Sequence, residues 1–186
     1  MDGKTRILGF GGSFRKGSYT KALLHAAKGL VPDGAELEIF DIEGMPFFNQ
    51  DLERNMPEEV RRFKDGIKAA DAVLISTPEY NYSVPGFLKN AIDWASRPYG
   101  DNSFEDKPVA IMSGSGGTFG GSRAQYHLRQ MLVFLNAHAI NKPEVIVTFI
   151  NEKIDHDGIV TDEKTREKIK EMLEALVSWS KRLDIK

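Results

Sequence analysis

The stretch RILGFGGSFRKGSYTKALLHAAKGL, residues 6–30, joins a short apolar run to a glycine-rich loop and then to a helical pattern. The run 6–10 is β-branched or apolar, as in a buried strand. After Ser18 the apolar residues recur at helical spacing until the sequence Pro-Asp-Gly at 32–34 ends the helix. A strand, a loop and a helix in this order begin a βαβ unit, so the stretch predicts an α/β protein with a parallel sheet.

Four further apolar runs repeat this alternation, at residues 36–40, 72–76, 109–113 and 145–149, and helical patterns begin near Pro57, Ser83, Ser122 and Thr161. Most of the runs are continuously apolar, which is typical of strands covered by helices on both faces. The run 36–40 alternates instead, so we expect it at an edge of the sheet. Five parallel strands leave two common orders, the Rossmann order and the flavodoxin-like order 2-1-3-4-5. Both place a ligand outside the carboxyl ends of the strands.

The composition limits the classes of function. The 186 residues, 41% of them hydrophobic and 28% charged, suffice for one core and predict a single domain, residues 1–186. A net charge of −2 provides no strong field for nucleic acid or an anionic membrane, so we expect a small-molecule ligand. The absence of cysteine means that electron transfer would need a cofactor. The apolar runs are too short for a membrane span or a signal peptide, which predicts a cytoplasmic protein.

The first candidate binding loop is GGSFRKGSYT at residues 11–20. Its glycines allow backbone N–H groups to approach an anion, Ser13, Ser18 and Thr20 add hydroxyl donors, and the helix start adds positive potential. Arg15 could pair with the same phosphate or lie over an aromatic ring. The loop therefore predicts a phosphate site; the alternative is a glycine-rich turn that Ser18 caps.

Two nucleotide-binding motifs are absent from this loop. The dinucleotide fingerprint GxGxxG, counted from Gly9 and Gly11, requires glycine where Phe14 stands. The glycine spacing of a P-loop is present, but Ser18 follows directly where a lysine is required. Neither motif supports a nicotinamide dinucleotide or a nucleoside triphosphate as the ligand of this loop.

Two more unusual loops follow predicted strands. The loop TPEYNYSVPG at 77–86 has two prolines that stiffen it, and its tyrosines and asparagine suit a flat heteroaromatic ligand. The loop SGSGGTFGG at 113–121 has five glycines and could present backbone amides to negative charge on a ligand. The alternatives are a rigid turn that covers the end of the sheet and a flexible connector, respectively. Since the carboxyl ends of these strands converge, the three loops together predict a site for FMN.

Three motifs resemble those of the NADPH-dependent FMN reductase family of flavodoxin-like proteins, which includes bacterial quinone, azo-dye and chromate reductases. They are GSFRKGS at 12–18, PEYNYSVPGFLKNAIDW at 78–94 and GGSRAQ at 120–125. The second is the most specific and looks especially like the soluble chromate reductases. The resemblance spans nearly the whole chain and implies a flavodoxin-like three-layer sandwich, with a five-stranded parallel sheet in the order 2-1-3-4-5.

The resemblance also implies which residues bind FMN. Contacts with the phosphate would come from Ser13, Arg15, Ser18 and Thr20, with Tyr19 beside them. The isoalloxazine would be lined by Pro78, Glu79, Tyr80 and Asn81, largely through the main chain. Ser83 would cap the following helix, and Ser115, Gly116 and Gly117 would approach the pyrimidine side of the ring. Because hydride transfer occurs at FMN N5, no catalytic acid or base and no metal are expected, and the four histidines are expected at the surface or an interface.

Relatives of this kind form dimers or tetramers, so the resemblance implies a homodimer or homotetramer. The helix after the third loop would meet another subunit near the flavin. Arg123, Tyr126 and Glu144 are candidates for a polar cluster at this contact. The alternative is an ordinary helix face exposed to solvent.

The reaction that the resemblance implies is a ping-pong transfer. NADPH or NADH would pass a hydride to FMN, and a quinone, azo compound, chromate or flavin would then be reduced at the same place. One alternative is a flavodoxin-type electron carrier without NAD(P)H reductase activity, although a net charge of −2 does not supply the acidic docking face of such carriers. A flavin-free nucleotide-dependent oxidoreductase is a second alternative, which the missing GxGxxG weakens.

Overall fold

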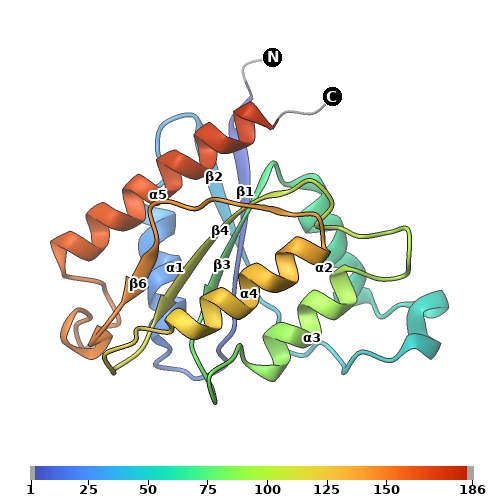
Figure 1. Cartoon of the computed structure of the whole chain (residues 1–186), viewed down its shortest axis with the longest axis horizontal. Helices are drawn as coiled ribbons and strands as arrows, with labels where there is room; N and C mark the ends of the chain where they lie inside the picture. The colour runs from blue at the N-terminus through green and yellow to red at the C-terminus, as the bar shows by residue number, and fades with distance from the viewer. Residues whose placement is uncertain (1–2, 184–186) are drawn as a thin grey trace.

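The computed structural model describes residues 3–183 and contains one parallel sheet with helices on both sides (Figure 1). Its strands are β1 (Thr5–Gly11), β2 (Ala35–Phe40), β3 (Ala72–Thr77), β4 (Pro108–Gly114), β5 (His138–Ala139) and β6 (Val145–Val147). The helices are α1 (Tyr19–Gly29), α2 (Glu58–Ala69), α3 (Gly86–Ala95), α4 (Ser122–Phe134) and α5 (Glu163–Arg182), with short 3-10 turns η1 (Gln50–Asn55) and η2 (Ile150–Glu152). The strand order β2-β1-β3-β4-β5 confirms the flavodoxin-like prediction and places β2 at an edge.

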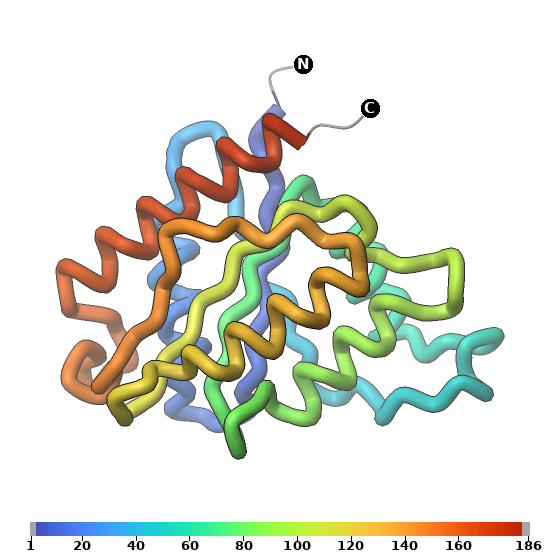
Figure 2. The backbone as a smooth tube through the Cα atoms, viewed as in Figure 1, coloured from blue at the N-terminus to red at the C-terminus, as the bar shows by residue number. Residues whose placement is uncertain are grey.

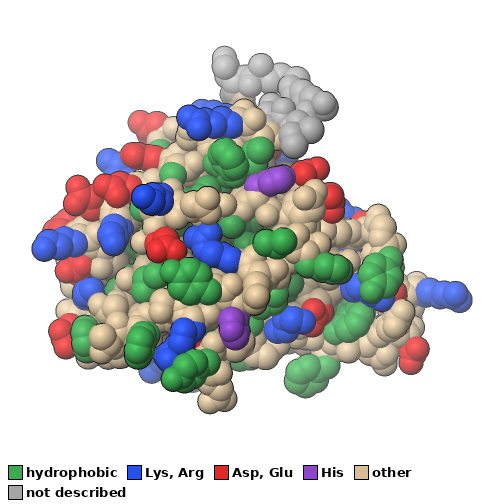
Figure 3. All heavy atoms as spheres, viewed as in Figure 1, with side chains coloured by type: hydrophobic (Ala, Val, Ile, Leu, Met, Phe, Trp, Pro, Cys, Tyr) green, Lys and Arg blue, Asp and Glu red, His purple; other side chains and the backbone are tan. Residues whose placement is uncertain are grey.

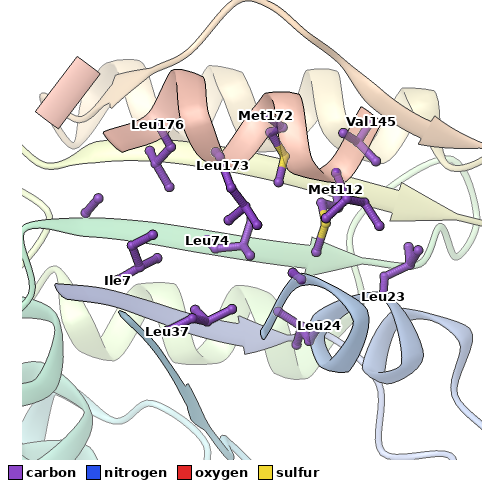
Figure 4. Packing of buried hydrophobic residues seen from close by; sticks show 14 of the residues in the cluster. Ile7, Leu23, Leu24, Leu37, Leu74, Met112, Val145, Met172, Leu173 and Leu176 are labelled. Carbon is purple, nitrogen blue, oxygen red and sulfur yellow. The ribbon is translucent and has the colours of Figure 1, made fainter. Parts of the chain in front are cut away.

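The three layers follow from the alternation of side chains along the buried strands. On β1, Ile7 belongs to a cluster with α1 and α5, whereas its neighbour Leu8 belongs to a cluster with α2, α3 and α4. Figure 4 shows the first cluster, in which Leu74 of β3 and Met112 of β4 lie between the two helices. Because both faces of the central strands are covered, their sequences are continuously apolar.

The fifth position of the sheet differs from the prediction of one strand at 145–149. Two short strands, β5 and β6, both pair with β4, and the chain between them leaves the sheet. Strand β6 ends at Val147, because Phe149 adopts a left-handed backbone conformation with φ 47° and leads into η2. Within residues 3–183, each helix is either too short or too polar to cross a membrane.

Candidate active site

The three loops singled out in the sequence meet at the carboxyl edge of the sheet, at the bottom of Figure 2. The strand register pairs Gly11 of β1 with Ser76 of β3, and Thr77 of β3 with Ser113 of β4, so the three strands end at nearly the same level. Beyond β1, the Gly12 N–H donates a hydrogen bond to the Ser76 carbonyl at 2.9 Å. The sheet therefore fixes the loops relative to one another.

The first loop presents buried hydroxyls beside the positive end of α1. Ser13, Ser18 and Thr20 are all buried. The Ser18 oxygen accepts a hydrogen bond from the Lys21 N–H at 3.2 Å and lies 3.0 Å from the Thr20 hydroxyl, so Ser18 caps the helix, as in the alternative of a capped glycine-rich turn. The N–H groups of Tyr19 and Thr20, in the first turn, have no acceptor within the helix. They supply the donors that a bound phosphate requires.

Aromatic contacts hold the rest of this loop. Arg15 is exposed, with its guanidinium carbon 4.7 Å from the centroid of the Tyr19 ring. Phe14 stacks on Phe87 of α3, with ring centroids 4.1 Å apart. Gly12 packs so closely on α3 that a Cβ atom there would lie 3.0 Å from a methyl group of Leu88 and 3.1 Å from its Cβ, so a larger residue would require Leu88 to move.

The second loop forms a tight turn after Pro78. The N–H of Tyr80 donates to the carbonyl of Ser83 at 2.9 Å, and the N–H of Ser83 donates to the carbonyl of Tyr80 at 2.9 Å. Asn81 and Tyr82, at the centre of the turn, have φ values of 50° and 67°. The rings of Tyr80 and Tyr82 remain exposed, so the turn offers the flat surface expected for a heteroaromatic ligand.

The prediction that Ser83 caps the third helix is wrong. Helix α3 begins at Gly86, and Pro85 occupies the N-cap position without a side-chain hydrogen bond. Because the Ser83 backbone closes the tight turn, it lies outside the helix, and its hydroxyl instead lies 3.1 Å from Nδ1 of His127 on α4. His127 is exposed as expected, but its contact with the second loop has no signal in the sequence.

The carboxylate of Glu79 turns away from the surface of the second loop. It accepts hydrogen bonds from the backbone N–H groups of Arg123 at 3.1 Å and Ala124 at 3.3 Å, and it pairs with the Arg123 guanidinium. The guanidinium carbon lies 3.7 Å from the centroid of the Tyr82 ring and 4.3 Å from that of Phe119. These contacts join the second loop, the third loop and the start of α4.

The third loop is held at both ends rather than being a flexible connector. The Ser113 hydroxyl donates to the Gly120 carbonyl at 2.7 Å, and the Gly117 N–H donates to the Ser115 hydroxyl at 3.3 Å. Gly121 has φ +85°, and a Cβ atom there would lie 2.8 Å from the Cβ of Ser113, so a side chain cannot replace this glycine without movement.

A fourth segment at this edge was not predicted. The Ser115 N–H donates to the Val147 carbonyl at 3.1 Å, and the Ile150 N–H donates to the Ser115 carbonyl at 3.1 Å. A Cβ atom on Gly116 would lie 3.2 Å from the Asn151 amide oxygen. Because β6 runs parallel to β4, the segment after it reaches the same edge, and the rule that identified the other loops could have identified this one.

Residues 154–158 also lie near the first loop. Together with the start of α1 they form a hollow of about 380 Å³, lined by Lys16, His25, Asp155 and His156 among others. No pattern in the sequence marks this contact, since it depends on where the chain between β6 and α5 is placed.

The residues considered for a subunit contact are divided between two places. Tyr126 and Glu144 line one hollow of about 860 Å³ beside β6, whereas Arg123 lies against Glu79 and the second loop. Within a single chain, therefore, Tyr126 and Glu144 line the same hollow, and Arg123 does not line it with them.

Comparison with known proteins decides the family. A family model described as NADPH-dependent FMN reductase matches residues 5–152. The chain belongs to this family. The chain is 50% identical over 184 residues to an NAD(P)H-dependent FMN reductase of Pseudomonas aeruginosa, covering 98% of this chain and 99% of that protein. It is 48% identical over 185 residues to an NAD(P)H:quinone oxidoreductase of Solanum tuberosum, covering 96% and 94%.

Solved structures agree with this assignment. The flavoenzyme NAD(P)H:(acceptor) oxidoreductase FerB of Paracoccus denitrificans superposes with a TM-score of 0.88 at 39% identity, covering 96% of this chain and 98% of that one. A WrbA-like flavodoxin from Agrobacterium tumefaciens shares the fold, with a TM-score of 0.63 at 12% identity over 96% and 98% of the two chains. The predictions of an oxidoreductase, of FMN as cofactor and of NAD(P)H as co-substrate are thereby confirmed.

The residues at the carboxyl edge fit FMN. The buried hydroxyls and first-turn N–H groups of α1 match a phosphate, and the exposed tyrosines of the second loop match a planar ring. The glycines of the third loop leave its backbone accessible, because a Cβ on Gly117 would meet only the Ser115 hydroxyl, at 4.0 Å.

Proposed function

We propose that this enzyme oxidises NAD(P)H and reduces a quinone at one site, in two half-reactions, with FMN lying across the three loops. The single observation that carries this proposal is the convergence of the three loops at the carboxyl edge of the sheet. FMN supplies the hydride chemistry when bound. The names of the relatives, an FMN reductase and a quinone oxidoreductase at 50% and 48% identity, support the choice of electron donor and acceptor.

In this proposal the chain positions the cofactor and excludes water. The phosphate is bound by Ser13, Arg15, Ser18 and Thr20, with Tyr19 beside them. The ring is lined, largely through the main chain, by Pro78, Glu79, Tyr80 and Asn81, and its pyrimidine side is faced by Ser115, Gly116 and Gly117. Ser83 closes the turn that carries the tyrosines. The N–H groups of Ser115 and Gly117 already donate to the Val147 carbonyl and the Ser115 hydroxyl, so the Gly116 N–H is the one that would stabilise negative charge at the pyrimidine. No side chain needs to donate or accept a proton.

The choice of acceptor depends on access to the exposed face of the ring. The two exposed tyrosines leave a flat, apolar surface that suits a quinone, and the same surface admits an azo compound or a free flavin. Chromate is a further acceptor that the resemblance to chromate reductases supports. Membership in a family of reductases makes the flavodoxin-type carrier the weaker alternative.

The assembly belongs to the proposal as well. Residues 1–186 form one FMN-binding domain that works in the cytoplasm as a homodimer or homotetramer. Apolar side chains gather on the face that carries α4 (Figure 3), and Tyr126, Val133 and Phe134 of this helix are exposed. Burial of such a face by a second copy would bring Arg123, Tyr126 and Glu144 near the contact.

The test is steady-state kinetics of FMN-loaded protein with NADPH, NADH and a panel of quinone, azo, chromate and flavin acceptors. We expect nicotinamide oxidation that depends on FMN and, when both substrates are varied, parallel double-reciprocal lines. Intersecting lines would contradict the two half-reactions, and a lack of nicotinamide oxidation with every acceptor would favour the electron carrier.

A further inference from the structure

We propose that Glu79 is a positioning residue whose carboxylate, acting through Arg123, holds the tight turn at residues 80–83 in place over the FMN ring. The inference depends on the proposed function only for the position of the FMN ring beneath the turn. The contacts themselves lie within the chain, and they can be tested without FMN.

The carboxylate of Glu79 has no free oxygen for acid–base chemistry. Oε2 accepts the backbone N–H groups of Arg123 and Ala124 at the start of α4, and Oε1 accepts Nε of Arg123 at 2.5 Å. The Glu79 side chain is only 7% exposed. Helix α4 has Gly121 at its N-cap and no side-chain cap of its own, so Glu79 supplies the missing cap from 44 positions away in the sequence.

Arg123 transmits this anchor to both loops. Its guanidinium lies between the rings of Tyr82 and Phe119, and these rings are otherwise exposed. A planar guanidinium stacks on aromatic faces and pairs with a carboxylate at the same time, which a lysine cannot do. The ion pair with Glu79 therefore fixes the orientation in which Arg123 supports Tyr82.

The turn needs this support because its backbone is strained. Asn81 tolerates a left-handed conformation, but Tyr82 at φ 67° does so at a cost in conformational free energy. The two hydrogen bonds between Tyr80 and Ser83 oppose this cost, as do the stacking of Tyr82 on Arg123 and the contact of Ser83 with His127. Strain of this kind persists only where the surroundings enforce it.

The matched control is the Glu53–Arg97 pair. Its Oε1–Nε distance is 2.7 Å, and both side chains are largely buried, at 13% and 14% exposure. Glu53 lies on η1 and Arg97 follows α3, so neither residue belongs to the three loops. Glu53→Ala therefore removes a comparable ion pair and separates loss of local positioning from general loss of stability.

The first measurement is amide hydrogen exchange of the full chain without FMN. We expect Glu79→Ala to accelerate exchange at Tyr80 and Ser83, the two amides that close the turn, while Glu53→Ala leaves them at the wild-type rate. Unchanged exchange at both amides in Glu79→Ala would overturn the inference, whatever the outcome for the proposed function.

The second measurement is FMN binding, followed by quenching of flavin fluorescence and by visible circular dichroism at saturation. We expect Glu79→Ala to raise the Kd of FMN by roughly tenfold and to alter the dichroism of the bound ring, because the turn over the ring loses the charge-assisted contact with Arg123 that holds it in place. Glu79→Gln, whose amide oxygen can still accept the N–H groups of α4, recovers part of the affinity. Equal Kd values and spectra for Glu79→Ala and the wild type would overturn the inference, whereas wild-type protein that binds no FMN would refute only the proposed function.

Discussion

Arg15 is the residue that distinguishes a phosphate site from a capped turn. Its guanidinium is exposed and lies over the ring of Tyr19, the first residue of α1. We expect Arg15→Ala to weaken FMN binding by about 1.5–3 kcal/mol, since it removes a charge-assisted contact with the phosphate. Equilibrium titration of the apoprotein with FMN measures this loss of binding free energy. Lys16→Ala removes the neighbouring exposed cation as a control, and equal losses in the two variants would contradict a specific role for Arg15.

Lys64 is a buried cation with a structural role. Its Nζ donates to the carbonyls of Ala95, at 3.2 Å, and Asp101, at 2.7 Å, and also to that of Arg97, while burial lowers the pKa of Lys64. Lys64→Met leaves these carbonyls without their donor and should cost about 3 kcal/mol in the free energy of unfolding.

Urea denaturation measures the free energy of unfolding of Lys64→Met and of a control variant, Lys68→Met. Lys68→Met removes an exposed partner of the Asp101 carboxylate and should cost less than about 1 kcal/mol. If the two variants lose the same stability, Lys64 does not hold the segment after α3.

At the scale of single elements, Asp162 links the stability of α5 to pH. Its carboxylate accepts the Thr165 hydroxyl at 2.6 Å and the Thr165 N–H at 2.8 Å, which lowers the pKa of Asp162. A carboxyl group whose pKa is lower in the folded state stabilises the protein above its unfolded pKa of about 3.9, and this stabilisation is lost as the pH falls through the folded pKa.

Asp162→Asn keeps a capping side chain but removes the charge. We therefore expect the wild type to be more stable than this variant at pH 6 to 7, with a difference that shrinks below about pH 4. Urea unfolding at several pH values measures it. A difference that stays constant down to pH 3 would contradict the assignment.

The elements also show where sequence patterns succeed and where they fail. The sequence predicts helix starts after Ser18 and near Thr161, and the observed N-caps, Ser18 and Asp162, both accept the backbone N–H three residues later. Ser83 looks similar in the sequence, but the turn that it closes and Pro85 after it move the start of α3 to Gly86. A capping residue can be recognised from its type. Whether Ser83 caps α3 or closes a turn depends on its contact with His127 on α4, which is distant in the sequence.

On the scale of the whole molecule, the exposed apolar face of α4 predicts self-association. Val133 is 80% exposed and Phe134 82%. We expect light scattering to give the mass of a dimer or tetramer, and Val133→Asp to shift it toward the monomer, because a charge would be buried in the contact. Ile159→Asp, at an exposed position outside α4, serves as the control and should leave the mass unchanged. A monomeric wild type would contradict the proposed assembly.

The convergence of the three loops, but not the contacts between them, could be predicted from the sequence. The strand order and the rule that ligands bind at the carboxyl ends of strands located all three loops. The pair between Glu79 and Arg123 joins the second loop to the start of α4, 44 residues further along the chain, and no local pattern around either residue indicates it. Packing at this edge decides which side chains hold a loop in place and which remain free to contact a ligand.

The proposed FMN site can be tested by the electron density of FMN in crystals of the saturated protein. We expect the phosphate to lie against residues 13–20, at the start of α1, and the ring to lie against residues 78–81 and 115–117. Density for the phosphate at any other part of the molecule, or an edge of the sheet that stays empty at saturating FMN, would contradict it.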